Sequence, residues 1–167
     1  MYATLSSFLA DWASESAKTL QLLRTLSDGS LSQAVEPEGR TVGRLAWHIT
    51  QTVPEMVNRT GLTVSGPTEN APVPSRAAEI VARYEEAAAA LATEIETKWE
   101  DATLLEEDDM YGQRWKRGAT LQALILHQAH HRGQMTVLMR QAGLRVPGIY
   151  GPAREEWAAF GAAPPAV

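Results

Sequence analysis

The sequence predicts an all-α protein, an antiparallel four-helix bundle with a short additional C-terminal helix. Four long segments repeat apolar residues every three or four positions, which is the period of an amphipathic helix. Breaks rich in glycine or proline separate them, and no strand pattern of comparable strength lies between them. A chain of 167 residues fits one such domain. We expect this domain to span residues 1–160 and a flexible tail to follow at 161–167.

The first two helices are expected in the N-terminal part of the chain. One runs from about residue 4 to residue 27 and ends at Asp28-Gly29, because glycine suits the left-handed conformation that closes a helix. The next follows Thr41, a suitable N-cap, and continues to about residue 59. Pro54 should kink or weaken it, since proline removes one backbone hydrogen bond.

The other two long helices flank a charged segment. Residues 61–74 hold three prolines and two glycines and are expected to form a surface connection. A third helix is predicted at about 75–99 and a fourth at about 120–142. Residues 100–118 are first acidic and then basic, which indicates a loop or a small hairpin. The simplest order for the four helices is up-down-up-down.

A short final helix is predicted after Pro152, which suits the first turn of a helix. Glu155 and Glu156 would then lie at its positive N-terminal end. Either glutamate could instead supply a general base, but favourable charge at a helix terminus is the simpler interpretation.

Composition excludes several classes of function. A net charge of −5 provides no basic surface for nucleic acid or anionic lipid. The absence of cysteine excludes disulfides, thiolate metal sites and cysteine nucleophiles. The N-terminal segment lacks the pattern of a secretory signal, and no apolar run is long enough to span a membrane. We therefore expect a cytoplasmic protein with no nucleic-acid or membrane partner.

Three histidines indicate a metal site. His127 and His131 are four residues apart on the fourth helix, about 40° apart around its axis, on the flank of the apolar stripe. Two imidazoles at this spacing can reach one ion. His48 holds a similar flanking position on the second helix and could be a third ligand. Three histidines would leave coordination positions for water or substrate, as in catalytic sites. The alternative is that these are hydrogen-bonded structural histidines.

His130 lies on a different side of the same helix, near a second stripe of apolar and small residues. A helix that is apolar on two sides usually has two packing partners. The stripe could form a homodimer seam or could pack on the N-terminal helix of its own chain. Its members are Ala123, Leu126, Gly133 and Val137.

The motifs LAWHIT on the second helix and HQAHHRGQM on the fourth, with the late segment IYGPAREEW, resemble those of the DinB-like (DinB/YfiT-type) metalloenzyme family. The resemblance covers nearly the whole chain. It implies a four-helix bundle, commonly dimeric, with a divalent metal ion on His48, His127 and His131, and leaves His130 outside the site. Several members of the family are thiol-dependent transferases, and many have no established reaction.

The function expected on this basis is metal-dependent transfer of a thiol to a small electrophile. Without cysteine in the chain, the thiol must arrive with a low-molecular-weight cosubstrate. Zinc or nickel is the first expectation for the ion, and iron or manganese the second. Imidazole suits zinc, nickel and iron, and cellular availability often decides which metal is bound. The alternatives are a metal-dependent hydrolase and a non-catalytic, metal-stabilised stress or ligand-binding protein.

Three further residues are candidates for catalysis or substrate binding. Gln134 should lie beside the ligands on the fourth helix, and Arg44 and Thr52 beside His48 on the second. Arg44 could hold an anionic group of the cosubstrate, although a solvated surface arginine is the simpler interpretation. Tyr111 and Trp115 could cover the site from the 100–118 segment.

Overall fold

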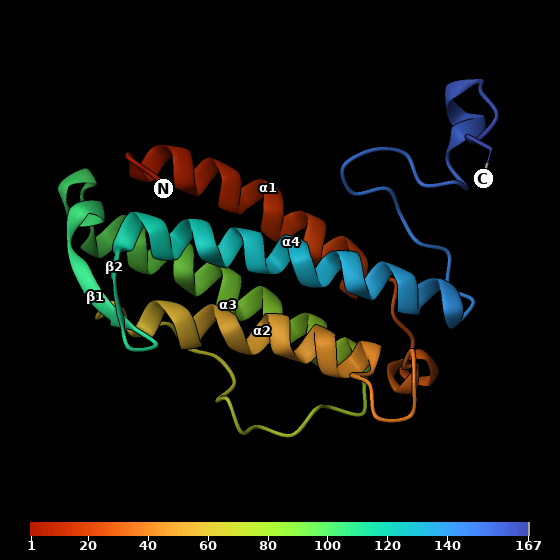
Figure 1. Ribbon diagram of the computed structural model, residues 1–167, viewed down its shortest axis with the longest axis horizontal. Helices are drawn as coiled ribbons and strands as arrows, with labels where there is room; N and C mark the ends of the chain where they lie inside the picture. Colours follow the sequence, from red (N-terminus) through yellow and green to blue (C-terminus); the bar gives the residue numbers. More distant parts are fainter. Residues whose placement is uncertain (167) are drawn as a thin grey trace.

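Four long α-helices form the framework of this computed structural model, which describes residues 1–166 (Figure 1). The predicted helical segments are confirmed, with bounds that differ by a few residues at each end. The helices are α1 (Leu5–Leu23), α2 (Val42–Asn58), α3 (Ala77–Lys98) and α4 (Arg117–Gln141). The first ends earlier than predicted, because a separate 3-10 helix, η1 (Asp28–Ser32), follows it.

Local sequence signals explain the start and course of α2. The Thr41 side chain accepts a hydrogen bond from the backbone N–H of Arg44, which satisfies one donor that a helix N-terminus leaves free. The helix continues through Pro54 to Asn58, so the predicted weakening does not end it. This continuity keeps His48 and the residues one turn further along on one rigid element.

The order of the helices differs from the predicted up-down-up-down arrangement. α1 packs against α3 and α4, and α2 packs against the same two helices. α1 and α4 run in the same direction, opposite to α2 and α3, so the bundle is not antiparallel throughout (Figure 1). The cause is the connection at residues 59–76, which can extend to about 60 Å. Since α2 is only about 26 Å long, this connection can return along the whole bundle before α3 begins.

Side chains of α2 hold this connection against the bundle. The Trp47 indole N–H donates to the carbonyl of Ala71 at 3.0 Å, and the Gln51 amide donates to the carbonyl of Thr68 at 2.7 Å. Gly66 allows close approach, since a Cβ atom there would lie 2.9 Å from Cγ of Pro54. Trp47 is therefore a packing residue that also fixes the connection.

A small β-hairpin corrects the all-α prediction. Its strands are β1 (Glu107–Met110) and β2 (Gln113–Lys116), preceded by the 3-10 helix η2 (Asp101–Leu105). The hairpin alternative for residues 100–118 is thus confirmed. Pairing of Glu107 with Lys116 and of Asp109 with Arg114 explains the acidic-then-basic pattern, because opposite charges stabilise facing positions. The two turn residues at 111–112 both have positive φ, as the tight turn of a two-residue hairpin requires.

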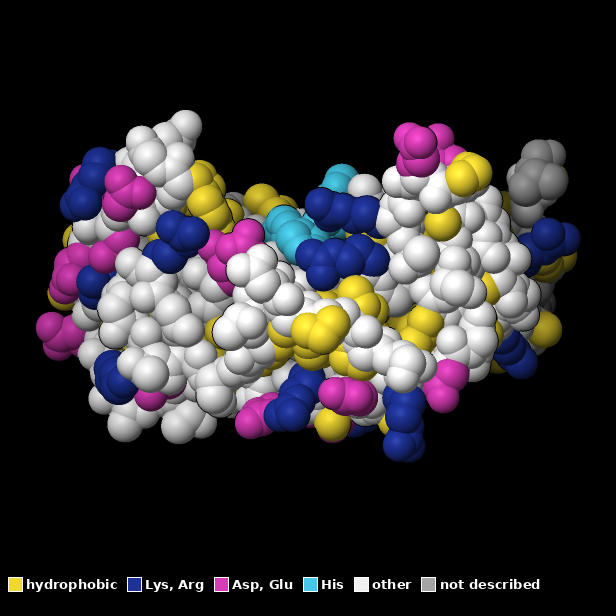
Figure 2. Space-filling view, turned by 90° about the horizontal axis from the view of Figure 1, so that it is seen from below, with side chains coloured by type: hydrophobic (Ala, Val, Ile, Leu, Met, Phe, Trp, Pro, Cys, Tyr) yellow, Lys and Arg dark blue, Asp and Glu magenta, His cyan; other side chains and the backbone are white. Residues whose placement is uncertain are grey.

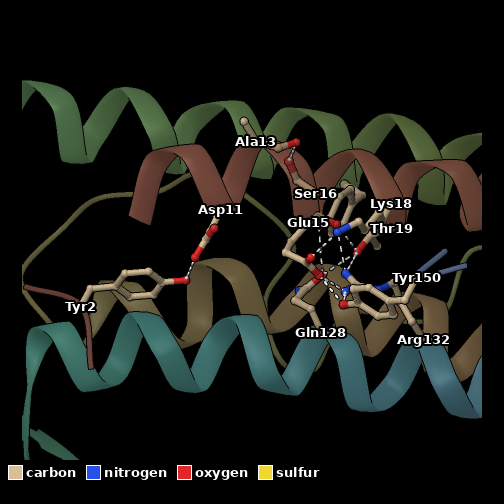
Figure 3. Close-up of polar contacts among 11 residues, drawn as sticks. Tyr2, Asp11, Ala13, Glu15, Ser16, Lys18, Thr19, Gln128, Arg132 and Tyr150 are labelled. Carbon is tan, nitrogen blue, oxygen red and sulfur yellow. Dashed lines mark hydrogen bonds and ion pairs between the residues drawn. The ribbon is translucent and has the colours of Figure 1, made fainter. Parts of the chain in front are cut away.

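A buried polar network joins α1, α4 and the C-terminal segment (Figure 3). The Arg132 side chain is 1% exposed, forms an ion pair with Glu15, and donates to the Thr19 hydroxyl at 2.8 Å. Tyr150 donates to the Glu15 carboxylate at 2.5 Å. Burial acts to raise the pKa of Glu15, but hydrogen bonds from Lys18 and Tyr150 and the charge of Arg132 hold it below its ordinary value. Glu15 is thus kept ionised inside the network.

The final helix is a single 3-10 turn, η3 (Trp157–Phe160), which begins later than the predicted helix after Pro152. The glutamates ahead of it have other partners. Glu156 accepts backbone hydrogen bonds from Gly148 and Ala153, and Glu155 forms an ion pair with Arg140. These bonds hold the chain in a loop before the turn starts.

Residues 161–166 contain no helix or strand, and residue 167, the end of the predicted tail, lies outside the described residues. Among the helices of residues 1–166, none combines the length and the apolar character needed to cross a membrane.

Candidate metal centre

Three histidine side chains from two helices converge at one point of the bundle. Nε2 of His48, on α2, lies 3.2 Å from Nε2 of His127 on α4. Nε2 of His131, one turn further along α4, lies 3.0 Å from the same atom. One ligand nitrogen from each ring lies within 4.8 Å of the other two. The sequence-predicted trio is therefore brought together, and we call it the histidine cluster.

The histidine cluster fits a single divalent ion. Two nitrogens bound to one zinc ion at about 2.0–2.1 Å, at tetrahedral angles, lie roughly 3.3–3.4 Å apart. The observed separations of 3.0 and 3.2 Å are close to this value. Hydrogen bonds among the three rings satisfy such a cluster poorly, because each N–H can donate to only one neighbouring nitrogen. Within residues 1–166 no further histidine or carboxylate joins the cluster, which leaves coordination positions open.

The surroundings favour neutral imidazoles. Burial, followed by the neighbouring histidines and nearby arginines, lowers the pKa of His48 to about 4. Burial and the neighbouring histidines lower the pKa of His127 to about 4 as well, and burial lowers that of His131. Neutral imidazole is the form that binds metal ions, so these side chains are prepared for coordination near neutral pH.

Gln134 fixes the orientation of one ligand. Its side-chain oxygen lies 2.7 Å from Nδ1 of His131. An amide oxygen can only accept, so the proton belongs on Nδ1 and the Nε2 lone pair points into the cluster. Metal-binding histidines commonly have such a partner on the second nitrogen. Nδ1 of His127 is also buried, and the described residues offer it no hydrogen-bond partner.

A cavity of about 470 Å³ opens beside His48 and His127, and we call it the first cavity. In the space-filling view, histidines lie in a hollow between basic side chains on one side and acidic side chains on the other (Figure 2). Arg40 and Arg44 contribute positive charge to its lining, and Glu55 and Glu69 contribute negative charge. This volume suits a small molecule.

The other candidates from the sequence take different places. Arg44 lines the first cavity and donates to the Gln51 side chain at 2.9 Å. Thr52 also lines it, but its hydroxyl donates to the carbonyl of Ile49 at 3.0 Å, which is an ordinary helix contact. Tyr111 and Trp115, at the hairpin, line the same cavity. The sequence therefore indicated several members of this lining.

Sequence reasoning missed Arg40, Glu55 and Glu69, which also line the first cavity. Glu55 was one turn from Thr52 and facing the same way, so its helix position could have indicated it. Arg40 and Glu69 lie in connections, where helical periodicity gives no signal.

A second cavity, of about 560 Å³, lies beside His131 and Gln134. Arg40 lines both this cavity and the first. His130 also lines the second cavity, and it is not a member of the histidine cluster. The histidine cluster therefore has open space on more than one side.

The second apolar stripe of α4 does not pack on α1 of its own chain. Leu126 is 61% exposed and Val137 is 53% exposed, and Gly133 is exposed as well. The own-chain alternative is therefore wrong, whereas the homodimer seam remains a prediction.

Comparisons with known proteins agree with the family resemblance of the histidine-containing motifs. The model of the DinB family matches residues 1–165. This chain belongs to the DinB family. The DinB chain is 48% identical over 161 residues to the uncharacterized protein YrdA of Bacillus subtilis (strain 168), covering 96% of each protein.

Solved structures show the same fold. A DinB-like protein from Bacillus cereus ATCC 10987 is 43% identical and superimposes with a TM-score of 0.87, covering 90% of this chain and 100% of that one. A DinB-like protein, YjoA, from Bacillus subtilis is only 16% identical, with a TM-score of 0.68 over 88% of this chain and 99% of that one. This second likeness concerns the fold alone.

Proposed function

We propose that this DinB-family protein binds one divalent metal ion on His48, His127 and His131 and catalyses transfer of a low-molecular-weight thiol to a small electrophile. Zinc or nickel is the expected ion, with iron or manganese next. The observation that carries the proposal is an open cluster of three neutral imidazole nitrogens in the wall of a cavity. A closed four-ligand cluster would favour a structural site instead.

A divalent ion at this cluster would lower the pKa of a coordinated thiol or water molecule. The chain's own residues perform the remaining tasks. Gln134 holds His131 in the tautomer that a ligand needs. Arg44, at the wall of the first cavity, can bind an anionic group of the thiol cosubstrate.

The proposed reaction balances without a further reagent. The thiol sulfur forms a bond to the electrophilic carbon, and the bond between that carbon and its leaving group breaks. The leaving group departs with the bonding electron pair, and the thiol proton passes to solvent. The chain has no cysteine, so it cannot itself supply the sulfur.

Two further parts of the proposal concern the setting of the protein. A cytoplasmic location would supply small thiols in their reduced form. A homodimer could form through the exposed apolar stripe of α4, which a single chain leaves uncovered at Leu126 and Val137.

The test combines metal loading with turnover. Zinc-loaded and nickel-loaded protein would be assayed with glutathione, mycothiol or bacillithiol as the thiol and chlorodinitrobenzene as a chromogenic electrophile. We expect a metal-dependent rate with at least one of these thiols, lost in His127→Ala and kept in Gln141→Ala, a control at an exposed position of α4 that lines neither cavity. Metal-dependent cleavage of a chromogenic ester, with no rate for any thiol, would contradict thiol transfer and favour the hydrolase.

A further inference from the structure

We infer that the histidine cluster lies between two cavities that serve different reactants: the first cavity receives the charged thiol, and the second receives an electrophile with an apolar body. This inference rests on the proposed function. It goes beyond that function because it assigns a separate binding site, with its own chemistry, to each of the two reactants.

The geometry of the cluster divides it between the two cavities. His48 and His127 line the first cavity, whereas His131 lines the second. The guanidinium-bearing side chain of Arg40 lines both. Nε2 of His131 is only 3.0 Å from Nε2 of His127, so molecules in the two cavities would approach the same point from different sides.

The first cavity has more charged side chains in its lining than the second cavity, beside apolar ones such as Trp115. Its lining contains two arginines and two glutamates, Arg40, Arg44, Glu55 and Glu69. Glu55 accepts from the Tyr111 hydroxyl at 2.7 Å and pairs with Arg59, which holds the acidic part of the lining in place. Burying a purely apolar body here would desolvate these groups without replacing their contacts with water.

The second cavity has a different lining. Four aliphatic side chains contribute to it, those of Val35, Leu45, Val137 and Leu138. Leu45 and Leu138 belong to the buried core, at 3% and 2% exposure, and they form a firm apolar wall. His131 and Gln134 lie hydrogen-bonded together at the cluster, and the remaining polar lining consists of Glu36, Arg40 and His130. An apolar body against the aliphatic wall, with one polar, reactive end toward His131, matches this lining.

Reactants held in separate cavities must be present together for reaction. The sulfur in the first cavity bonds to the electrophilic carbon at the edge of the second. For chlorodinitrobenzene the carbon–chlorine bond breaks, chloride leaves with the electron pair, and the thiol proton passes to solvent. The rate should then depend on both concentrations in the sequential pattern of a ternary complex, without a ping-pong pattern.

A kinetic test uses a variant in which a larger side chain reduces the volume of the second cavity. Val137→Trp places a large ring in its lining. Leu126→Trp is the matched control, since Leu126 is also exposed on α4 and belongs to the same apolar stripe but does not line this cavity. With glutathione and chlorodinitrobenzene as probes, we expect Val137→Trp to raise KM for the electrophile at least about tenfold and KM for the thiol less than about twofold. Arg44→Gln should instead raise KM for the thiol at least about tenfold and KM for the electrophile less than about twofold. Equal effects of the two tryptophan variants on KM would overturn the inference.

A binding test separates this inference from the proposed reaction. Dinitrobenzene lacks the leaving group, so its affinity for zinc-loaded protein can be measured by calorimetry with no thiol present. We expect Val137→Trp to weaken binding at least about tenfold, and Leu126→Trp and Arg44→Gln to leave it within about twofold. Failure of the wild type to bind, or a loss of binding in Arg44→Gln instead, would overturn the assignment. The expected binding pattern without any turnover would support the second cavity and contradict the proposed function.

Discussion

Two polar clusters on α4 lie one residue apart along the chain but face different sides of the bundle. His127 and His131 face α2, whereas Gln128 and Arg132 face α1 and the buried interior. The Gln128 amide donates to the carbonyl of Ile49 at 3.1 Å, and its oxygen accepts from the Tyr84 hydroxyl at 2.9 Å. The Arg132 side chain is likewise surrounded by partners from other elements.

The difference lies in what each cluster leaves unsatisfied. In the Glu15–Arg132 network the charges are opposite and both terminal guanidinium nitrogens of Arg132 meet acceptors within the protein, although its buried Nε has no hydrogen-bond partner among the described residues (Figure 3). In the histidine cluster three nitrogens of the same kind face one another beside open cavities. Buried polar groups that the protein satisfies itself stabilise the fold, and those that need an outside partner mark a candidate site.

The largest expected effect is the loss of unfolding free energy when the Glu15–Arg132 network is broken. Arg132→Met should lower the free energy of unfolding by about 1.5–3 kcal/mol, because Glu15 loses a charge-assisted hydrogen bond and keeps Lys18 as its only cationic partner. Urea unfolding of the metal-free protein measures this. Arg83→Met, which removes the exposed pair with Glu86, should cost at most about 1 kcal/mol. Equal losses in the two variants would show that the network has no special role in stability.

The next effect concerns the histidine cluster alone. Gln134→Leu should weaken metal affinity about 10–100-fold, because His131 loses the acceptor that fixes its tautomer. The unfolding free energy of the metal-free protein should change by less than about 0.5 kcal/mol, since Gln134 is exposed. Competition with a chelating dye measures the affinity, with the exposed Gln141→Leu at the end of α4 as control. Similar metal affinities in Gln134→Leu and Gln141→Leu would argue against a role of Gln134 in orienting His131.

A further expected effect is on the pH dependence of stability. Burial lowers the pKa of His48 and His127 to about 4 in the folded protein, against an ordinary value of about 6.5. Between these values the unfolded chain binds more protons, so the metal-free protein should lose stability as the pH falls through this window. The double variant His48→Gln/His127→Gln should show a shallower loss in urea unfolding between pH 7 and pH 4. An unchanged slope would contradict the neutral state of these histidines.

The parts of the molecule that the sequence predicted depend on local signals. The four helices follow from apolar periodicity, and Thr41 and the glycines near helix ends set their approximate limits. The spacing of His127 and His131 places both rings on one face of α4 whatever the tertiary structure is. His48 came into the prediction by its similar position on α2 and by the family motif.

The parts that were not predictable depend on contacts between distant residues. Glu15 and Arg132 are 117 positions apart, and nothing near either residue indicates the other. The direction of α3 depends on where the connection at 59–76 attaches, through contacts such as that of Gln51 with Thr68. Arg40 reaches both cavities from a connection, where no periodicity reports the direction of a side chain.

Metal content is the most direct test of the central claim. Untagged protein and the variants His48→Ala, His127→Ala, His131→Ala and His130→Ala would be reconstituted with zinc or nickel, desalted and measured by mass spectrometry. We predict close to one ion per chain in the wild type and in His130→Ala, and a large loss in each of the other three. A wild type that retains no metal, or a His130→Ala variant that loses it along with the others, would contradict a centre built on His48, His127 and His131.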